Sequence, residues 1–214
     1  MFNIIHGELY IGDSFPPSLL KLFKDWNSCV RFAFCRITKD SITDLNELRK
    51  ICKLQYPGMK VNMVYSAIDQ GKGMAKRSET GEVDEDGRKI YQKVIFGGKD
   101  NFKKVTTRDI SLSDWRHERD KAVYSRGENC GSVFGNTNFR IINHETMLIY
   151  TGGYKPLEFK LFIPRKFRTE LEHLINSGQS YGVRLELKED YGKMRVTIDY
   201  QTKNIEPFVT FENG

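Results

Sequence analysis

The chain has 214 residues and a formal net charge of +6 at pH 7, with 39% hydrophobic and 29% charged residues. This length permits one large or two small domains with a buried core, and the composition argues against a disordered chain. No apolar run approaches the roughly 18 residues of a membrane span, and no basic-then-apolar leader opens the chain, so a cytoplasmic protein is expected.

The first half of the chain has helical periodicity after an extended start. Residues 2–12 predict an opening strand. Helices are expected from Pro16–Pro17 to about residue 34, over 44–55 and over about 59–77, because apolar residues recur at steps of three and four. Asp44 is the expected N-cap of the second helix.

Two further segments precede the strand-rich part of the chain. Residues 78–89 predict an acidic loop, and residues 112–126 predict an amphipathic helix capped by Ser111. The apolar face expected for that helix consists of Leu112, Trp115, Ala122 and Val123. Trp115, like Trp26, is expected to pack in the core and not to stack on bases.

Past Gly131 the period changes to two, which is typical of strands. Strands are expected at 138–142, 146–150, 157–163, 183–187 and 194–200, with a short helix at 166–176. Several short antiparallel strands suggest a small barrel, and the opening strand is expected to join it because no other strand lies near it in sequence. The predicted fold is α+β. A discontinuous β-barrel domain, residues 1–13 and 131–214, is interrupted by a helical insertion, residues 14–130.

The positive charge is concentrated in the predicted insertion. Residues 14–130 carry 23 basic and 16 acidic side chains, whereas the remainder carries 11 basic and 12 acidic ones. This asymmetry favours an anionic partner. The cations predicted to bind nucleic acid are Lys72, Lys76, Arg77, Lys99, Lys103, Lys104, Arg108, Arg116 and Arg119. The alternative for each of them is a solvated surface charge.

No catalytic or metal-binding constellation accompanies these cations. Asp100 follows the Gly97-Gly98-Lys99 turn, whereas a Walker motif needs Ser or Thr after its lysine. Asp199 alternates with apolar neighbours and reads as an ordinary solvent-face residue. The histidines are dispersed, and no two cysteines form a CxxC pair, so no cofactor and no metal site is predicted. The cysteines, which are expected to be buried free thiols, are Cys29, Cys35, Cys52 and Cys130.

The order of the motifs resembles a known arrangement. The chain begins with a strand and helices, followed by the FGGK segment with its basic tail. The segment GN-NFRI at 135–141 comes next. A strand, a short helix and the sequence YGVRLELKEDYGKMRVTIDY then close the pattern. This order is similar to the N-terminal lobe of TnpB, the insertion-sequence-encoded RNA-guided nuclease, and of the related type V CRISPR effectors. The resemblance covers about Ile4 to Tyr200. It implies a wedge domain made of strands and a helical recognition domain, which together hold a guide RNA and read a short motif beside the target DNA.

The chain departs from that family after Tyr200. TnpB proteins continue into a RuvC-like nuclease domain with clustered carboxylates, which two-metal cleavage requires, whereas only QTKNIEPFVTFENG remains here. The chain as given is therefore expected to bind without cutting, and Mg²⁺ is expected only if a nuclease domain follows Gly214. No small-molecule substrate and no membrane partner is predicted. A stand-alone RNA- or DNA-binding module and a protein-interaction module with a basic face are the alternatives.

Overall fold

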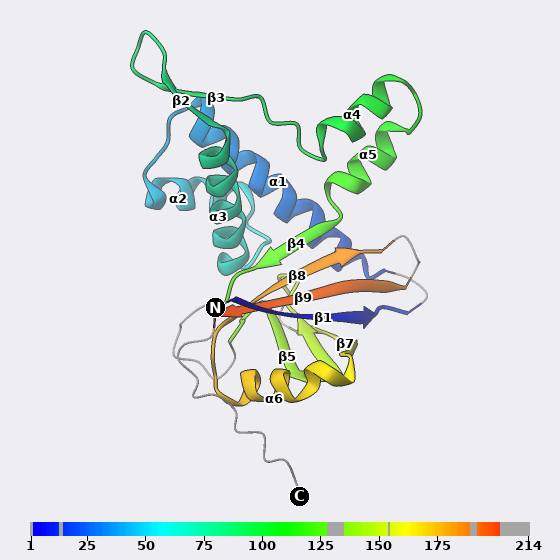
Figure 1. Ribbon diagram of the computed structural model, residues 1–214. Coiled ribbons are helices and arrows are strands. Elements are labelled where there is room, and N and C mark those ends of the chain that lie inside the picture. The colour runs from blue at the N-terminus through cyan, green and yellow to red at the C-terminus, as the bar shows by residue number, and fades with distance from the viewer. Residues whose placement is uncertain (1, 13–14, 128–134, 154, 189–191, 202–214) are drawn as a thin grey trace, which may run out of the picture.

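The computed structural model describes residues 2–12, 15–127, 135–153, 155–188 and 192–201. It confirms the α+β prediction: a curved seven-stranded antiparallel sheet lies below five helices, and a sixth helix lies beneath the sheet (Figure 1). Within the described residues no helix has the length and apolar character needed to cross a membrane.

The sheet forms an antiparallel half-barrel. Its strands, in spatial order, are β4 (Ala122–Ser125), β8 (Tyr181–Leu187), β9 (Lys193–Gln201), β1 (Phe2–Tyr10), β7 (Leu157–Phe162), β6 (Thr146–Ile149) and β5 (Phe139–Asn143). The predicted pairing of the opening strand with the C-terminal strands is confirmed, because β1 pairs with β9 along its whole length and with β7 at its end. Alternation places Ile5 and Leu9 of β1 in the core and leaves Ile4 and Tyr10 on the outer face.

A buried asparagine ties the two edges of the half-barrel together at one end. Asn136 donates hydrogen bonds to the carbonyl oxygens of Ser125 in β4 and Tyr181 in β8, at 3.0 and 3.1 Å. Its side-chain oxygen accepts from the backbone N–H of Phe139, where β5 begins, at 2.9 Å. Gly135 precedes it with a φ of 53°, and a side chain there would overlap the ring of Tyr181. The Gly-Asn pair thus joins the edges where the backbone ladder ends.

The helices above the sheet are α1 (Pro17–Lys39), α2 (Leu45–Gln55), α3 (Val61–Ser78), α4 (Lys99–Thr106) and α5 (Leu112–Arg119). Asp44 caps α2 as predicted, accepting from the N–H of Glu47 at 2.7 Å. Helices α1 and α3 pack together and cover the edge strand β4: Asn27 donates to the carbonyl oxygen of Ala122, and Ser66 to that of Tyr124. These bonds satisfy edge carbonyls that another chain could otherwise pair with.

On the other side of the sheet, a 3₁₀ turn, η1 (Arg165–Phe167), leads into α6 (Arg168–Asn176). Leu171 and Leu174 of α6 are buried in the core.

Trp26 is buried as predicted. Cys29 and Cys52 are buried free thiols, and Cys35 is half-buried.

Three predictions lie wholly or partly outside the described residues. They concern the thiol of Cys130, most of the turn at 189–192, and the segment after Gln201.

The predicted acidic loop at 78–89 is wrong, because this segment is a two-stranded ribbon. Its strands are β2 (Glu79–Val83) and β3 (Lys89–Tyr91). The turn is organised by Asp84, whose carboxylate accepts from the backbone N–H groups of Asp86 and Arg88 at 3.0 and 2.8 Å. Gly87 supplies the positive φ that closes the turn. The sequence of this segment therefore contains a turn signal, Asp84-x-x-Gly87, in addition to its acidic residues.

The predicted helix at 112–126 is also wrong in its second half. Helix α5 ends at Arg119, and the next residues form β4, which pairs with β8. Val123 of β4 is completely buried in the core and pairs with Leu185, so strand pairing with a distant segment overrides the helical spacing. Leu112, expected on the buried face, is 45% exposed. Residues 14–130 therefore also contribute one strand to the sheet.

Candidate nucleic-acid interface

Helices α4 and α5 form a small pair, termed here the basic lobe (residues 96–119), which stands apart from α1–α3 (Figure 1). The chain passes close to α5 at Gly97. A side chain at this position would place its Cβ 2.9 Å from Nε1 of Trp115. The ring of Trp115 in turn meets Phe102 edge-on, with the centroids 5.4 Å apart. Neither helix contains a fully buried residue. Gly97 of the Gly-Gly-Lys turn thus lets α5 pack closely against the chain before α4.

Helix α5 starts where the sequence predicted. The Ser111 hydroxyl accepts from the N–H of Asp114 at 3.0 Å, and the Asp114 carboxylate accepts from the N–H of Ser111 at 3.2 Å. This reciprocal capping fixes the first turn of the helix. The pKa of Asp114 is lowered by a hydrogen bond that its carboxylate accepts from the Ser111 hydroxyl and, second, by the one that it accepts from the Ser111 N–H. The cap therefore orients the arginines of α5 relative to α4.

The lobe contains six of the nine predicted cations, and five of the six are exposed. Lys99, Lys103 and Lys104 lie on α4, Arg108 follows its C-terminus, and Arg116 lies on α5; all five are exposed. Among the described residues, the one ion pair that involves these five cations joins Lys103 to Asp100 at 3.9 Å, with both side chains more than half exposed. Such a pair contributes almost nothing to stability. These cations are available to an external anion.

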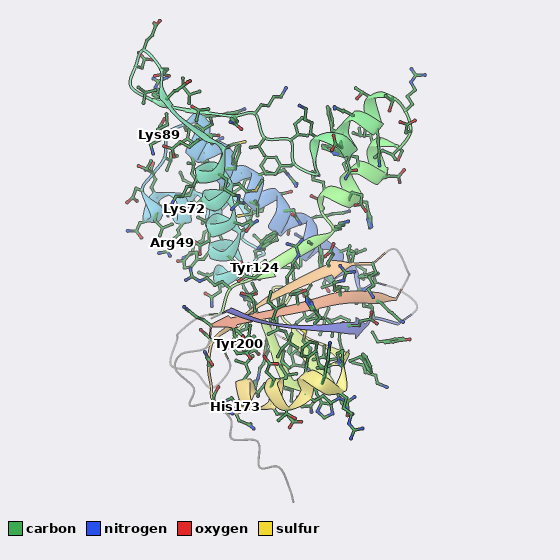
Figure 2. All side chains as sticks on the ribbon, in the orientation of Figure 1. Arg49, Lys72, Lys89, Tyr124, His173 and Tyr200 are labelled. Carbon is green, nitrogen blue, oxygen red and sulfur yellow. The ribbon has the colours of Figure 1, made fainter. Side chains whose placement is uncertain are left out.

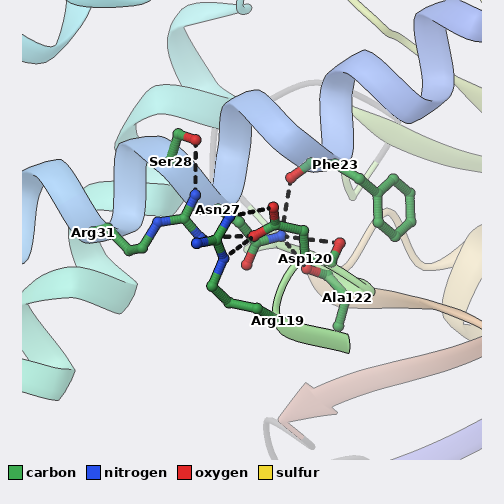
Figure 3. A network of polar contacts seen from close by, with 7 residues as sticks. All are labelled: Phe23, Asn27, Ser28, Arg31, Arg119, Asp120 and Ala122. Atoms are coloured by element: carbon green, nitrogen blue, oxygen red, sulfur yellow. Dashed lines mark hydrogen bonds and ion pairs between the residues drawn. The ribbon is translucent and has the colours of Figure 1, made fainter. Parts of the chain in front are cut away.

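Arg119 is placed differently from its neighbours in the lobe. Its guanidinium donates two hydrogen bonds to Asp120, at 3.0 and 2.9 Å, and Arg31 of α1 donates a third at 2.7 Å (Figure 3). All three side chains are at least four-fifths buried. Burial alone would raise the pKa of Asp120, but the bonds from the two arginines hold it below its ordinary value. Arg119 thus joins the lobe to α1.

The remaining three predicted cations lie elsewhere. Lys72, Lys76 and Arg77 are exposed on α3, and the first two border a hollow of about 280 Å³ beside Lys89 of the ribbon. In Figure 2, Lys72 and Lys89 lie on the far side of the helices from the basic lobe. The exposed predicted cations therefore form two separate groups, five in the basic lobe and three on α3.

A groove of about 670 Å³ lies between the helices and the outer face of the sheet. Trp26, Met74 and Phe96 provide apolar walls, and Arg184, Thr197 and Asp199 come from the sheet. This volume falls in the range of ligand sites.

Asp199 lies on the outer face as predicted, but it is half-buried and bonded, which the sequence did not indicate. The Tyr124 hydroxyl donates to its carboxylate at 3.1 Å, and a Cβ at Gly182 would approach that carboxylate to 2.6 Å. Burial raises the pKa of Asp199, although the bond from Tyr124 lowers it in part. Burial and the nearby carboxylate raise the pKa of Tyr124 to about 12. The Gly182 position opposite Asp199 in the hairpin was the signal that could have revealed this contact.

Within the described ranges, no three His, Cys, Asp or Glu side chains gather where they could hold a metal ion.

The family model of the SSO2105 N-terminal domain matches residues 4–206. The chain belongs to this family. The match includes the opening strand, all the helices and the closing hairpin, so the SSO2105 N-terminal domain comprises the sheet and the helices together. No curated protein matches the chain. The family name states no activity.

Proposed function

We propose that this SSO2105 N-terminal domain is the nucleic-acid-binding lobe of an RNA-guided system of the TnpB and type V kind, holding a guide RNA and a target-flanking DNA motif. The observation that supports this most is the basic lobe. It presents five exposed cations, four on two helices that contain no fully buried side chain and one, Arg108, in the turn between them.

The cations of the lobe contribute little to the fold. Lys99 and Lys103 lie four residues apart on one face of α4, where like charges destabilise a helix. The Asp100 carboxylate lies 3.9 Å from the Lys103 ammonium, and this largely exposed pair offsets the repulsion only weakly. A phosphate backbone supplies the missing counter-charge, and its binding releases condensed ions. Nucleic acid is thus the class of partner that suits the lobe.

The name of the family supports a lobe that works with a further domain. The family is named for the N-terminal domain of SSO2105, so in that protein further sequence follows. In the guided nucleases that this chain resembles, base pairing supplies the sequence specificity, and the protein contacts backbone, shape and a flanking motif. A basic lobe without a base-reading motif fits that division of roles.

The test is a titration with RNA at several salt concentrations. The variant Lys103→Ala/Lys104→Ala/Arg108→Ala should bind RNA more weakly. The slope of log affinity against log salt should fall by about two units, since each lost phosphate contact removes roughly 0.7–0.9. The matched control replaces three exposed lysines of α1 and α2, Lys24, Lys39 and Lys50, and should leave the slope unchanged.

The choice of RNA separates guide binding from its alternatives. RNA that co-purifies with the chain is sequenced, transcribed again and compared with random-sequence RNA of equal length. A strong preference for the co-purified transcript supports guide binding. Equal affinity for both would reduce the proposal to a general nucleic-acid-binding module, and equal slopes for the lobe variant and the wild type would move the site away from the lobe.

A further inference from the structure

The outer face of the sheet carries an aromatic side chain between two lysines. In the ladder of three strands, Tyr10 of β1 lies opposite Lys193 of β9 on one side and Lys160 of β7 on the other. Residues directly opposite each other in antiparallel strands point to the same face. The Nζ of Lys193 lies 5.2 Å from the centroid of the Tyr10 ring. Across the three strands, the aromatic side chain of Tyr10 thus lies between the two lysines.

A second aromatic side chain lies diagonally from the first. Phe162 of β7 is opposite Glu8, two residues before Tyr10 on the same face of β1. Tyr10 is 54% exposed and Phe162 is 55% exposed, whereas Leu9 and Leu161 on the core face are buried. These two rings therefore do not belong to the buried core. Covering them with a binding partner would remove apolar surface from water, which is favourable.

The charges around the rings favour an anion. The hollow over these strands, of about 500 Å³, is bordered by Lys160, Arg168 and Lys193. Its two carboxylates are those of Glu8 and Glu145. Glu8 accepts a hydrogen bond from Lys188, and this bond is the main reason why its pKa is lowered. One of the two acids is thus already neutralised by a cation outside the hollow.

We propose that this face, termed here the stacking platform (Tyr10, Phe162, Lys160 and Lys193), binds unpaired nucleotides of a single strand. Bases stack on Tyr10 and Phe162, and the phosphates beside them contact Lys160 and Lys193. Aromatic rings on an exposed sheet, flanked by cations, form the usual surface for unstacked bases. The inference rests on the proposed function, to which it adds a second site that acts through stacking where the basic lobe acts through charge.

The two kinds of contact give different signatures in one experiment. The probes are a 12-nucleotide oligouridylate, the matching oligothymidylate and a 12-base-pair RNA duplex. The variant Tyr10→Ala/Phe162→Ala should lose about fivefold to a hundredfold in affinity for each stacked base of the single strands. The salt slope should stay unchanged, because no charge is removed. The variant Lys160→Ala/Lys193→Ala should lower that slope by roughly 1.4. The affinity for the RNA duplex should be the same for Tyr10→Ala/Phe162→Ala and the wild type, because the bases of a duplex are not free to stack on the rings.

Matched variants keep the test decisive. Tyr10→Phe preserves the ring and should bind like the wild type, whereas Leu54→Ala removes a 74% exposed apolar side chain from α2 and should change nothing. Unfolding curves of all variants verify the fold. Wild-type affinity of Tyr10→Ala/Phe162→Ala for both single strands would overturn the platform, and a protein-docking face would then explain the rings. The basic-lobe variant tests the proposed function separately, because it changes none of these four residues.

Discussion

Two arginines of one short helix show how differently the same side chain is used in this molecule. Arg116 and Arg119 lie one turn apart on α5. Arg116 is exposed, whereas Arg119 shares the carboxylate of Asp120 with Arg31. The first belongs to the basic lobe. The second belongs to the group of Arg31, Arg119 and Asp120, termed here the junction, which fastens the lobe to α1. A count of positive residues cannot separate them, because the difference lies in their partners.

The surroundings of the two regions explain their different energetic weight. At the junction, the N···O distances are 2.7 and 2.9 Å and the side chains are no more than 20% exposed. In the lobe, Lys103 and Asp100 are 3.9 Å apart and 66% and 92% exposed. Water screens the second pair almost completely, but it screens the first only in part. Stability should therefore depend on the junction, and binding should depend on the lobe.

The largest effect is expected from Asp120→Ala. This change leaves Arg31 and Arg119 buried without their carboxylate and should lower the free energy of unfolding by about 2–4 kcal/mol. Chemical denaturation of the wild type and the variant measures this loss. The control Asp100→Ala removes a carboxylate from the exposed pair and should change stability by less than about 0.5 kcal/mol. Equal losses in the two variants would contradict the distinction between junction and lobe.

The same junction should give stability a defined pH dependence. Because the folded pKa of Asp120 lies below its unfolded value, its contribution is complete above the ordinary value of about 4. The contribution is lost as pH falls below that value and through the lowered pKa. Denaturation between pH 3 and pH 7 should therefore show the difference between wild type and Asp120→Ala shrinking at the acid end. A constant difference would mean that packing, and not charge, holds the junction.

A smaller effect is expected from Arg108→Gly in the lobe. Arg108 has a φ of 65°, a conformation that favours glycine, and it follows the C-terminus of α4. Glycine should raise stability by about 0.5–1 kcal/mol through relief of strain. It should also lower the salt slope of RNA binding by roughly 0.7–0.9. Arg116→Ala should lower the slope similarly without the gain in stability. A loss of stability in Arg108→Gly would show that the guanidinium supports the fold.

The smallest effect is expected from Asp199→Asn in the groove. Asp199 accepts a hydrogen bond from a tyrosine, whereas Asp120 accepts its bonds from two arginines. Burial raises the pKa of Asp199, so the folded state favours its protonated form, and its ionisation costs stability as pH rises through the raised value. Asparagine can still accept from Tyr124 without carrying the charge. The variant should be more stable than the wild type at pH 7 by less than about 1 kcal/mol, since Asp199 is only half-buried. The gain should vanish near pH 3; a gain at both pH values would exclude ionisation as its cause.

The sequence by itself determined most of the helices and strands. The three- and four-residue spacing predicted α1, α2 and α3, and alternation predicted the closing hairpin, β8 and β9. Caps at Asp44 and Ser111 were predicted correctly because a cap is made by residues three positions apart. The pairing of β1 with the C-terminal strands followed from the absence of a nearer partner. All of these depend on local patterns or on simple elimination.

The tertiary structure alone decided which residues meet. It made β4 a strand through pairing with β8, and it turned Arg119 into a structural residue through Arg31 and Asp120, which are 89 positions apart. It also placed Tyr10 between Lys160 and Lys193, a row drawn from three separate segments. The physical reason is that the charge, exposure and stacking capacity of a side chain depend on its neighbours in space. In this sheet those neighbours are set by strand register, which no short stretch of the sequence encodes.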